Sequence, residues 1–140
     1  MSKQKKFVDI RQDTLIPGTP RQIFELWLDS TKHAALTGGE AHIVPKVGGK
    51  FTVFDGWATG ATVELVPDRK IVQTWRADDW PPGQESTVTL TLRPAKGGTN
   101  LSFQQTGVPA AKAKAIAQGW RDYYWTPLRE LLMAASTSQK

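Results

Sequence analysis

The 140-residue chain has the length of one domain, and its 39% hydrophobic and 22% charged residues are typical of a globular protein. The absence of cysteine excludes disulfides, zinc–thiolate sites and thiol catalysis, and without a ~20-residue apolar run or an apolar N-terminal segment we expect a cytoplasmic protein with no membrane span. Of the 18 basic residues, four are lysines near the chain ends (Lys3, Lys5, Lys6 and Lys140), and the other 14 are interspersed with 13 acidic residues, so we expect no nucleic-acid partner.

A tail and a strand are predicted at the start of the chain. Residues 1–6 are mostly polar and include three lysines, which is typical of a flexible N-terminal tail. Residues 7–16 are rich in β-forming side chains, although apolar and polar residues alternate imperfectly there. We expect a single domain over residues 7–136.

Two short helices are expected next. Thr19 can cap a helix that has Pro20 in its first turn, and Gln22 completes a capping box. Asp29 is expected to cap a second helix, which ends before Gly38. The first of these helices carries an apolar stripe at helical spacing, formed by Ile23, Phe24, Trp27 and Leu28.

The middle of the chain predicts antiparallel strands joined by tight turns. Asp55-Gly56 is a two-residue hairpin signal. In the clearest strand, three apolar residues alternate with three threonines, so one face is expected to be buried and the other wet. The strands are expected at residues 50–54, 57–66, 70–77, 87–92 and 99–106.

A long helix crowded with aromatic residues is expected over residues 112–135. Pro127 predicts either a kink, which we favour, or a restart of the helix with Thr126 as its cap. Because a sheet with one wet face must be covered on the other, this helix is expected to cover it. The expected fold class is α+β, with a curved antiparallel six-stranded sheet wrapped around the C-terminal helix and two short helices after the first strand.

Several motifs carry a resemblance to a known family. They are VGGKF at 47–51, DG at 55–56, LVPD at 65–68, IV at 71–72, WR at 75–76, WP at 80–81, TVTLT at 87–91, GVP at 107–109 and QGWRDYY at 118–124. With this spacing the chain resembles the C-terminal domain of the activator of the Hsp-90 chaperone ATPase. That family lies within the START-like, Bet v 1-like (SRPBCC) helix-grip superfamily.

This resemblance implies both a fold and two kinds of partner. The helix-grip fold is a curved antiparallel sheet that grips a C-terminal helix, as expected above. The superfamily implies a small hydrophobic or lipid-like ligand in a cavity between sheet and helix. The family implies an Hsp-90-type chaperone as the partner and a role in stress response as a co-chaperone.

The polar residues form no recognisable catalytic or metal-binding set. His33 and His42 have no ligand spacing with each other or with a carboxylate, so we interpret both as surface or capping residues. Asp78-Asp79 stands before a proline-rich segment and is interpreted as a solvated turn. We therefore expect no catalytic residue, no metal and no cofactor, and a protein that is not an enzyme.

The aromatic residues are the candidates for a binding site. Trp27, Trp75 and Trp120 are interpreted first as core. If a cavity exists, indole and phenol groups would orient a mostly apolar ligand in it. Trp80, in a proline-rich loop, is expected to be exposed as a partner contact or a lid, or else to pack within the loop. The cavity candidates are Phe54, Trp57, Trp75, Trp120, Tyr123 and Tyr124.

Three functions follow from these observations. The leading one is a non-enzymatic module that binds a small hydrophobic or lipid-like ligand, which needs a cavity of ~300 Å³ or more to hold a drug-sized molecule. The second is a co-chaperone of an Hsp-90 homologue. The third is an enzyme acting on an aromatic or polyketide-like substrate, which lacks an acid–base constellation.

Overall fold

The computed structural model describes residues 6–138, with side chains placed as far as residue 133. Of the expected tail at residues 1–6, residues 1–5 lie outside this described part. The strands and helices are, in chain order, β1 (Phe7–Ile16), α1 (Pro20–Leu28), α2 (Ser30–Thr37), β2 (His42–Ile43), β3 (Lys50–Val53), a 3-10 turn (Phe54–Gly56), β4 (Ala58–Val66), β5 (Lys70–Ala77), β6 (Ser86–Ala95), β7 (Gly98–Pro109), a second 3-10 turn (Ala110–Lys112), α3 (Ala113–Trp120), a π-helical turn (Arg121–Trp125) and α4 (Thr126–Ser138).

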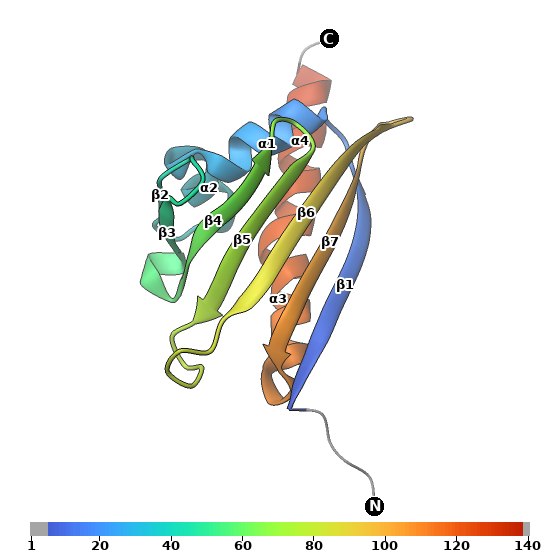
Figure 1. Ribbon diagram of the computed structural model, residues 1–140. Coiled ribbons are helices and arrows are strands. Elements are labelled where there is room, and N and C mark those ends of the chain that lie inside the picture. The colour runs from blue at the N-terminus through green and yellow to red at the C-terminus, as the bar shows by residue number, and fades with distance from the viewer. Residues whose placement is uncertain (1–5, 139–140) are drawn as a thin grey trace, which may run out of the picture.

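One antiparallel sheet runs through the molecule in the order β1-β7-β6-β5-β4-β3-β2 (Figure 1). The expected count of six strands is wrong, because the described residues form seven. The additional strand is β2, whose two residues, His42 and Ile43, pair with Thr52 and Phe51 of β3. Two residues are too few to show an alternating pattern, so the sequence carries no signal for this strand.

The caps of the two N-terminal helices agree with the sequence. Thr19 Oγ1 accepts from the backbone N–H of Gln22 at 3.1 Å, and the Gln22 side chain accepts from the Thr19 N–H at 2.8 Å. Asp29 accepts from the backbone N–H of Lys32 at 2.8 Å, which caps α2. The left-handed backbone of Gly38, with φ of 83°, ends α2.

The sheet buries the face that the alternation predicts. Val88, Leu90 and Leu92 of β6 are at most 2% exposed, and Leu101 and Phe103 of β7 are equally buried. The C-terminal helix crosses this face diagonally, so the sheet and the helix enclose the core (Figure 1). This is the α+β helix-grip arrangement that the sequence predicts.

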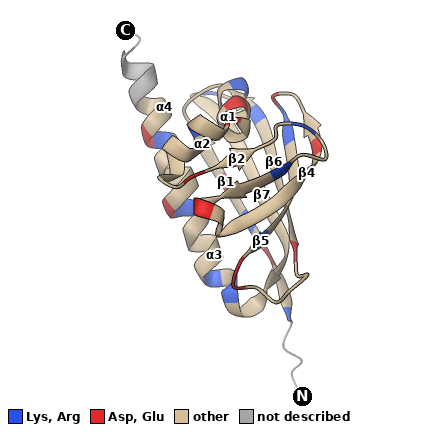
Figure 2. Cartoon of the chain, turned by 90° about the vertical axis from the view of Figure 1, so that its left-hand side faces the viewer, with Lys and Arg blue, Asp and Glu red and all other residues tan. Residues whose placement is uncertain are grey.

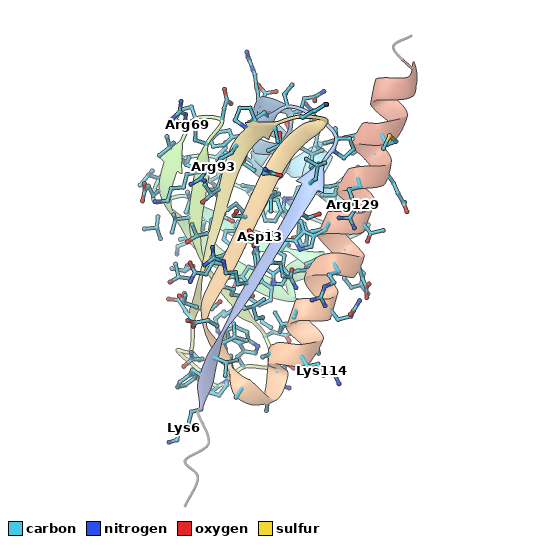
Figure 3. All side chains as sticks on the ribbon, turned by 90° about the vertical axis from the view of Figure 1, so that its right-hand side faces the viewer. Lys6, Asp13, Arg69, Arg93, Lys114 and Arg129 are labelled. Carbon is cyan, nitrogen blue, oxygen red and sulfur yellow. The ribbon has the colours of Figure 1, made fainter. Side chains whose placement is uncertain are left out.

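The C-terminal helix contains one wide turn immediately before its proline. Pro127 has no N–H, so in regular α-geometry the carbonyl of Tyr123 would lack its partner. The preceding segment is π-helical, and the N–H of Thr126 reaches back five residues to the carbonyl of Arg121. Beyond it α4 continues to Ser138, alongside β1, where Arg129 donates to Thr14 (Figure 3). The helix therefore accommodates Pro127 by widening and runs on.

Charged side chains are mixed on the molecular surface. On the face seen in Figure 2, both basic and acidic residues occur along the C-terminal helix and the sheet. Two ion pairs within the described residues are local, Arg21–Glu25 at 2.9 Å and Lys70–Glu64 at 3.5 Å. A third, Lys112–Asp79, joins segments distant in sequence. Across residues 6–138, no helix combines the length and the apolarity needed to cross a membrane.

Candidate functional site

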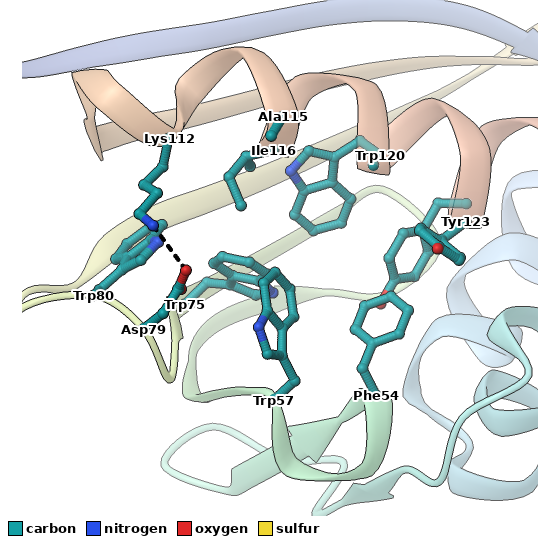
Figure 4. A pocket seen from close by; sticks show the side chains of 12 residues that line it. Phe54, Trp57, Trp75, Asp79, Trp80, Lys112, Ala115, Ile116, Trp120 and Tyr123 are labelled. Atoms are coloured by element: carbon teal, nitrogen blue, oxygen red, sulfur yellow. Dashed lines mark hydrogen bonds and ion pairs between the residues drawn. The ribbon is translucent and has the colours of Figure 1, made fainter.

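A pocket of about 490 Å³ opens between the start of the C-terminal helix and the neighbouring end of the sheet. Figure 4 shows the side chains that surround it. Seven of its twelve lining residues are aromatic: Phe54, Trp57, Trp75, Trp80, Trp120, Tyr123 and Tyr124. The other five are Asp79, Lys112, Ala115, Ile116 and Gly119.

The rest of the space under the helix is packed. The cavity around Trp27, His33 and Gln73 has a volume of about 10 Å³, which is no more than one water needs. The same helix therefore closes onto solid core beside α1 and α2 and leaves a hollow where α3 begins. The sheet and the helix enclose both core and cavity, in different places.

One face of α3 supplies the helical wall of the pocket. Its lining residues recur every three or four positions, which places them along one side of the helix. Gly119 is notable among them, because a Cβ built at this position would meet nothing within 4 Å. The small side chain of Ala115, one turn earlier, lies on the same face.

The opposite wall is a chain of aromatic rings in edge-to-face contact. The ring centroids of Phe54 and Trp57 are 6.0 Å apart at 78°, and those of Trp57 and Trp75 are 5.7 Å apart at 74°. Trp75 and Trp80 continue the chain at 5.5 Å and 64°. Such contacts fix the rings relative to one another. Trp57 is 37% exposed and Tyr123 52% exposed, so these two residues form the rim.

Trp80 is buried, at 3% exposure, which makes its expected exposure wrong. The guanidinium of Arg76 donates to the backbone carbonyls of Trp80 at 2.8 Å, Pro81 at 3.2 Å and Gln84 at 3.2 Å. These bonds fold the proline-rich loop back over the end of β5. The indole of Trp80 consequently packs on Trp75 as part of the pocket wall.

Three of the tryptophans donate their indole N–H to a glutamine on the sheet. Trp27 donates to Gln73 of β5 at 3.1 Å, Trp120 to Gln105 of β7 at 2.8 Å, and Trp125 to Gln12 of β1 at 2.6 Å. Gln105 in turn donates to Ser86 at 2.9 Å. A buried indole normally finds such a partner, so these three rings are held in place by the fold.

Two tryptophans of the pocket wall differ from those three. The indole N–H groups of Trp75 and Trp80 are buried and have no hydrogen-bond acceptor among the described residues. Both rings line the pocket. An unsatisfied buried donor costs about 1–3 kcal/mol, and in a native fold it calls for an explanation.

Tyr124, which lines the pocket, forms a buried pair with His33, which lines the small packed cavity and not the pocket. His33 is 2% exposed, so the surface alternative is wrong for this residue. The capping alternative agrees with the structure, because the His33 ring bonds a carbonyl in the last turn of α1. Its Nδ1 lies 2.8 Å from the carbonyl of Trp27 and must donate, so Nε2 accepts from the Tyr124 hydroxyl at 2.8 Å. Burial lowers the pKa of His33 and raises the pKa of Tyr124. Both groups are therefore neutral at pH 7, and Tyr124 is held as a hydrogen-bond donor.

The outer end of the pocket is spanned by an ion pair. Lys112 Nζ lies 2.9 Å from Asp79 Oδ2, and the two side chains are 43% and 49% exposed (Figure 4). The hydrogen bond from Lys112 lowers the pKa of Asp79. This pair ties the loop after β5 to the beginning of α3.

All six cavity candidates and Trp80 lie around one pocket, although the residues come from distant segments. That any of them binds a ligand stays a prediction. The sequence interpretation missed Asp79, Lys112 and Gly119. Helical spacing on the face of Trp120 could have found Lys112 and Gly119, whereas nothing local marks Asp79.

Among the described residues no group of three or more His, Asp or Glu is arranged to hold a metal.

The sequence model of one protein family matches most of the chain. Its description is "Activator of Hsp90 ATPase homolog 1-like protein", and the match covers residues 17–133. The match includes the whole pocket.

Individual relatives agree with that match. The chain is 32% identical over 112 residues to the human activator of 90 kDa heat shock protein ATPase homolog 1, covering 80% of the chain and 33% of the human protein. It is 35% identical over 104 residues to the Dictyostelium discoideum homologue, covering 74% of the chain and 27% of that protein. The chain thus spans about a third of the length of these curated relatives.

A solved structure agrees with the fold. The crystal structure of an HSP90 activator from Plasmodium falciparum superposes with a TM-score of 0.80 at 25% identity. The superposition covers 91% of this chain and 96% of that one.

Proposed function

The chain belongs to the activator of Hsp90 ATPase homologue 1-like family, and on that premise we propose that it binds a small, largely aromatic ligand in the pocket beside α3. The observation that carries this proposal is the pocket of about 490 Å³ with seven aromatic side chains in its wall. Ligand sites of ~300–1,000 Å³ with apolar, aromatic walls and few polar groups hold drug-sized molecules. No chemical conversion is part of the proposal.

The packing around the pocket supports this proposal over a purely structural role for the aromatic residues. Trp27 and Trp125 have both a filled environment and a glutamine partner, whereas Trp120 has a glutamine partner and also lines the pocket. The rings of Trp57, Trp75 and Trp80 instead stand beside open volume. A fold can bury apolar rings by packing other side chains against them. Rings that surround an open pocket lose these van der Waals contacts.

An uncharged aromatic probe tests the proposal. 2-Naphthamide has about 13 non-hydrogen atoms, so ~0.3 kcal/mol per atom gives about −4 kcal/mol, or a Kd of about 1 mM or tighter. Titration into the ¹⁵N-labelled full chain should shift the indole resonances of Trp57, Trp75 and Trp80. Native mass spectrometry of the freshly purified chain should show a fraction with added mass. A chain that is uniformly empty and does not respond to the amide would end the proposal.

A second candidate is binding to an Hsp90-type chaperone. The names of the human and Dictyostelium relatives support it, as does the extent of the superposition on the Plasmodium HSP90 activator. The test is calorimetric titration of the full chain with a purified Hsp90-type chaperone, together with the chaperone's ATPase rate. The candidate fails if neither binding nor a change in the rate is found. Because Gly119→Leu would fill only the pocket, unchanged chaperone binding by this variant would separate the two functions.

A further inference from the structure

The outer end of the pocket carries the charged side chains of its wall. Lys112 and Asp79 are the charged residues among the twelve that line it. Their ion pair crosses from helix to loop at 2.9 Å, with both side chains about half exposed. A pair of this kind contributes little to stability, so it can open at small energetic cost and offer either of its groups to a ligand.

The helix begins at this same end. Lys112 stands at the N-cap of the eight-residue α3, its side chain makes no capping hydrogen bond, and the first turn contains no acidic residue. The leading N–H groups of a helix and the positive end of its dipole favour a negative charge nearby. Asp79, brought in from the loop, places a negative charge on the Lys112 ammonium at this end of the helix.

An unsatisfied donor lies beside the pair. The indole N–H of Trp80 is buried with no acceptor in the described part of the chain, and Trp80 follows Asp79 in sequence and lines the same pocket as Lys112. Its edge-to-face contact with Trp75 offers at most a weak N–H–π interaction. The ammonium, the helix end and the indole N–H are all complementary to an acceptor with negative charge.

We call the part of the pocket between Ala115 and Gly119 on the helix and the rings of Trp57 and Trp75 the slot. Ala115 and Gly119 leave one stretch of the helical wall nearly flat, with open space where a Gly119 side chain would be. Across from them stand the rings of Trp57 and Trp75 (Figure 4). A planar ring system fits between a flat backbone surface and aromatic faces, and stacking on those faces would stabilise the bound ring.

From these features we propose that the ligand of this pocket is a flat aromatic acid whose carboxylate replaces Asp79 on Lys112. The rings lie in the slot between Gly119 and the tryptophans, the carboxylate pairs with Lys112 at the helix end, and Asp79 turns out into water. One anion exchanges for another, so the net charge buried at the site does not change. The inference rests on the proposed ligand binding and specifies its chemistry.

The competing chemistry is an aromatic cation. Ring faces attract cations, and Asp79 could bind one after releasing Lys112. The helix end and the donor of Trp80 oppose that choice, because both would then face a positive charge. The two chemistries predict opposite effects of changing Asp79, which makes them separable.

Three probes of one shape test the inference. They are 2-naphthoate, 2-naphthamide and naphthalen-2-ylmethylammonium, titrated into the ¹⁵N-labelled full chain at low ionic strength. We expect the acid to bind about tenfold more tightly than the amide, the gain typical of a partly exposed charge-assisted hydrogen bond. Added salt should weaken only the acid, and the acid should shift the indole N–H resonance of Trp80 more than the amide does.

Two variants assign the charge. Lys112→Gln should remove the preference for the acid, so that acid and amide bind with equal affinity. Asp79→Asn should strengthen acid binding about threefold to tenfold, because it removes the competing carboxylate. The controls are Lys114→Gln and Asp78→Asn, neighbouring exposed residues outside the pocket, of which Lys114 points away from the body (Figure 3). Thermal unfolding of each variant confirms that it is folded.

Each outcome decides a separate claim. Equal binding of acid and amide, or an Asp79→Asn variant with unchanged acid affinity, overturns the carboxylate exchange while ligand binding stands. Preference for the ammonium probe, weakened by Asp79→Asn, overturns it in favour of a cation. If none of the three probes binds, the proposed ligand binding itself fails.

Discussion

Replacing Gly119 should make the protein more stable and close its pocket. A glycine inside a helix is less stable than alanine there by about 0.5–1 kcal/mol. Gly119 has no compensating packing, since a Cβ at this position would meet nothing within 4 Å. We therefore expect Gly119→Ala to raise the free energy of unfolding by about 0.5–1 kcal/mol, a Tm increase of roughly 2–3 °C for a chain of this size.

A larger side chain at the same position separates stability from binding. Gly119→Leu should gain a similar helix-propensity term, and its side chain would project into the slot between the helix and Trp57. We expect it to weaken 2-naphthamide binding at least ~10-fold, a loss of ~1.4 kcal/mol. Lys114→Leu is the matched control, because it adds the same side chain on the outer face of the same helix (Figure 3).

Urea unfolding followed by far-UV circular dichroism gives the stabilities, and ¹⁵N-detected titration gives the affinities. A Gly119→Ala variant that is less stable than the parent would mean that the space beside the helix is not open. A Gly119→Leu variant that binds the amide as well as the parent would place the ligand elsewhere. Either result refutes the pocket as described.

The remaining predictions concern the groups that support the pocket. Because burial lowers the pKa of His33, the histidine binds a proton more readily in the unfolded chain than in the folded one. Stability should therefore be full above about pH 6.5, the pKa of an unfolded histidine, and should fall as the pH drops below that value. Urea midpoints measured from pH 8 to 5 should show this fall in the parent and in the exposed-histidine control His42→Asn, and a smaller fall in His33→Asn. Gln105→Leu should lower stability by about 1–3 kcal/mol, because it leaves the buried indole N–H of Trp120 without a partner, while the Ser86 hydroxyl keeps its bond to the Trp75 carbonyl. A variant within ~0.5 kcal/mol of the parent contradicts the assigned role. Arg76→Ala should release the loop over β5 and expose Trp80, which should increase acrylamide quenching of tryptophan fluorescence. Arg69→Ala, outside the loop, should leave the quenching unchanged. Quenching of Arg76→Ala equal to that of the parent would show that the loop keeps its position without Arg76.

Local patterns in the sequence predicted much of the fold correctly. The Thr19–Gln22 capping box, the Asp29 cap and the alternation at Thr87–Leu92 depend on neighbours within a few residues, and each occurs in the structure. The strand at Phe7–Ile16 also agrees with the sequence interpretation. β2 could not be predicted, because two residues carry no periodicity and its pairing with β3 decides its conformation.

The candidate site was only partly predictable, for a related reason. Aromatic residues with no obvious place in the core pointed to the pocket wall. The burial of Trp80, however, depends on the side chain of Arg76 bonding to later carbonyls of the loop. The Lys112–Asp79 pair joins residues 33 positions apart, and the burial of His33 depends on Tyr124, 91 positions away. Contacts of such separation have no signature in a local pattern.

The indole–glutamine bonds have a consequence for how the C-terminal helix can sit on the sheet. A helix that slid along the sheet by one turn, ~5.4 Å, would still bury apolar rings, since its stripe repeats at nearly that spacing. It would, however, separate Trp120 from Gln105 and Trp125 from Gln12. Each broken bond leaves a buried indole N–H unpaired, and the first also leaves the buried Gln105 side-chain oxygen unpaired, at about 1–3 kcal/mol per group. These two hydrogen bonds thus allow only one register of the helix on the sheet. The slot beside Gly119 keeps its width because the helix has no second register of similar energy.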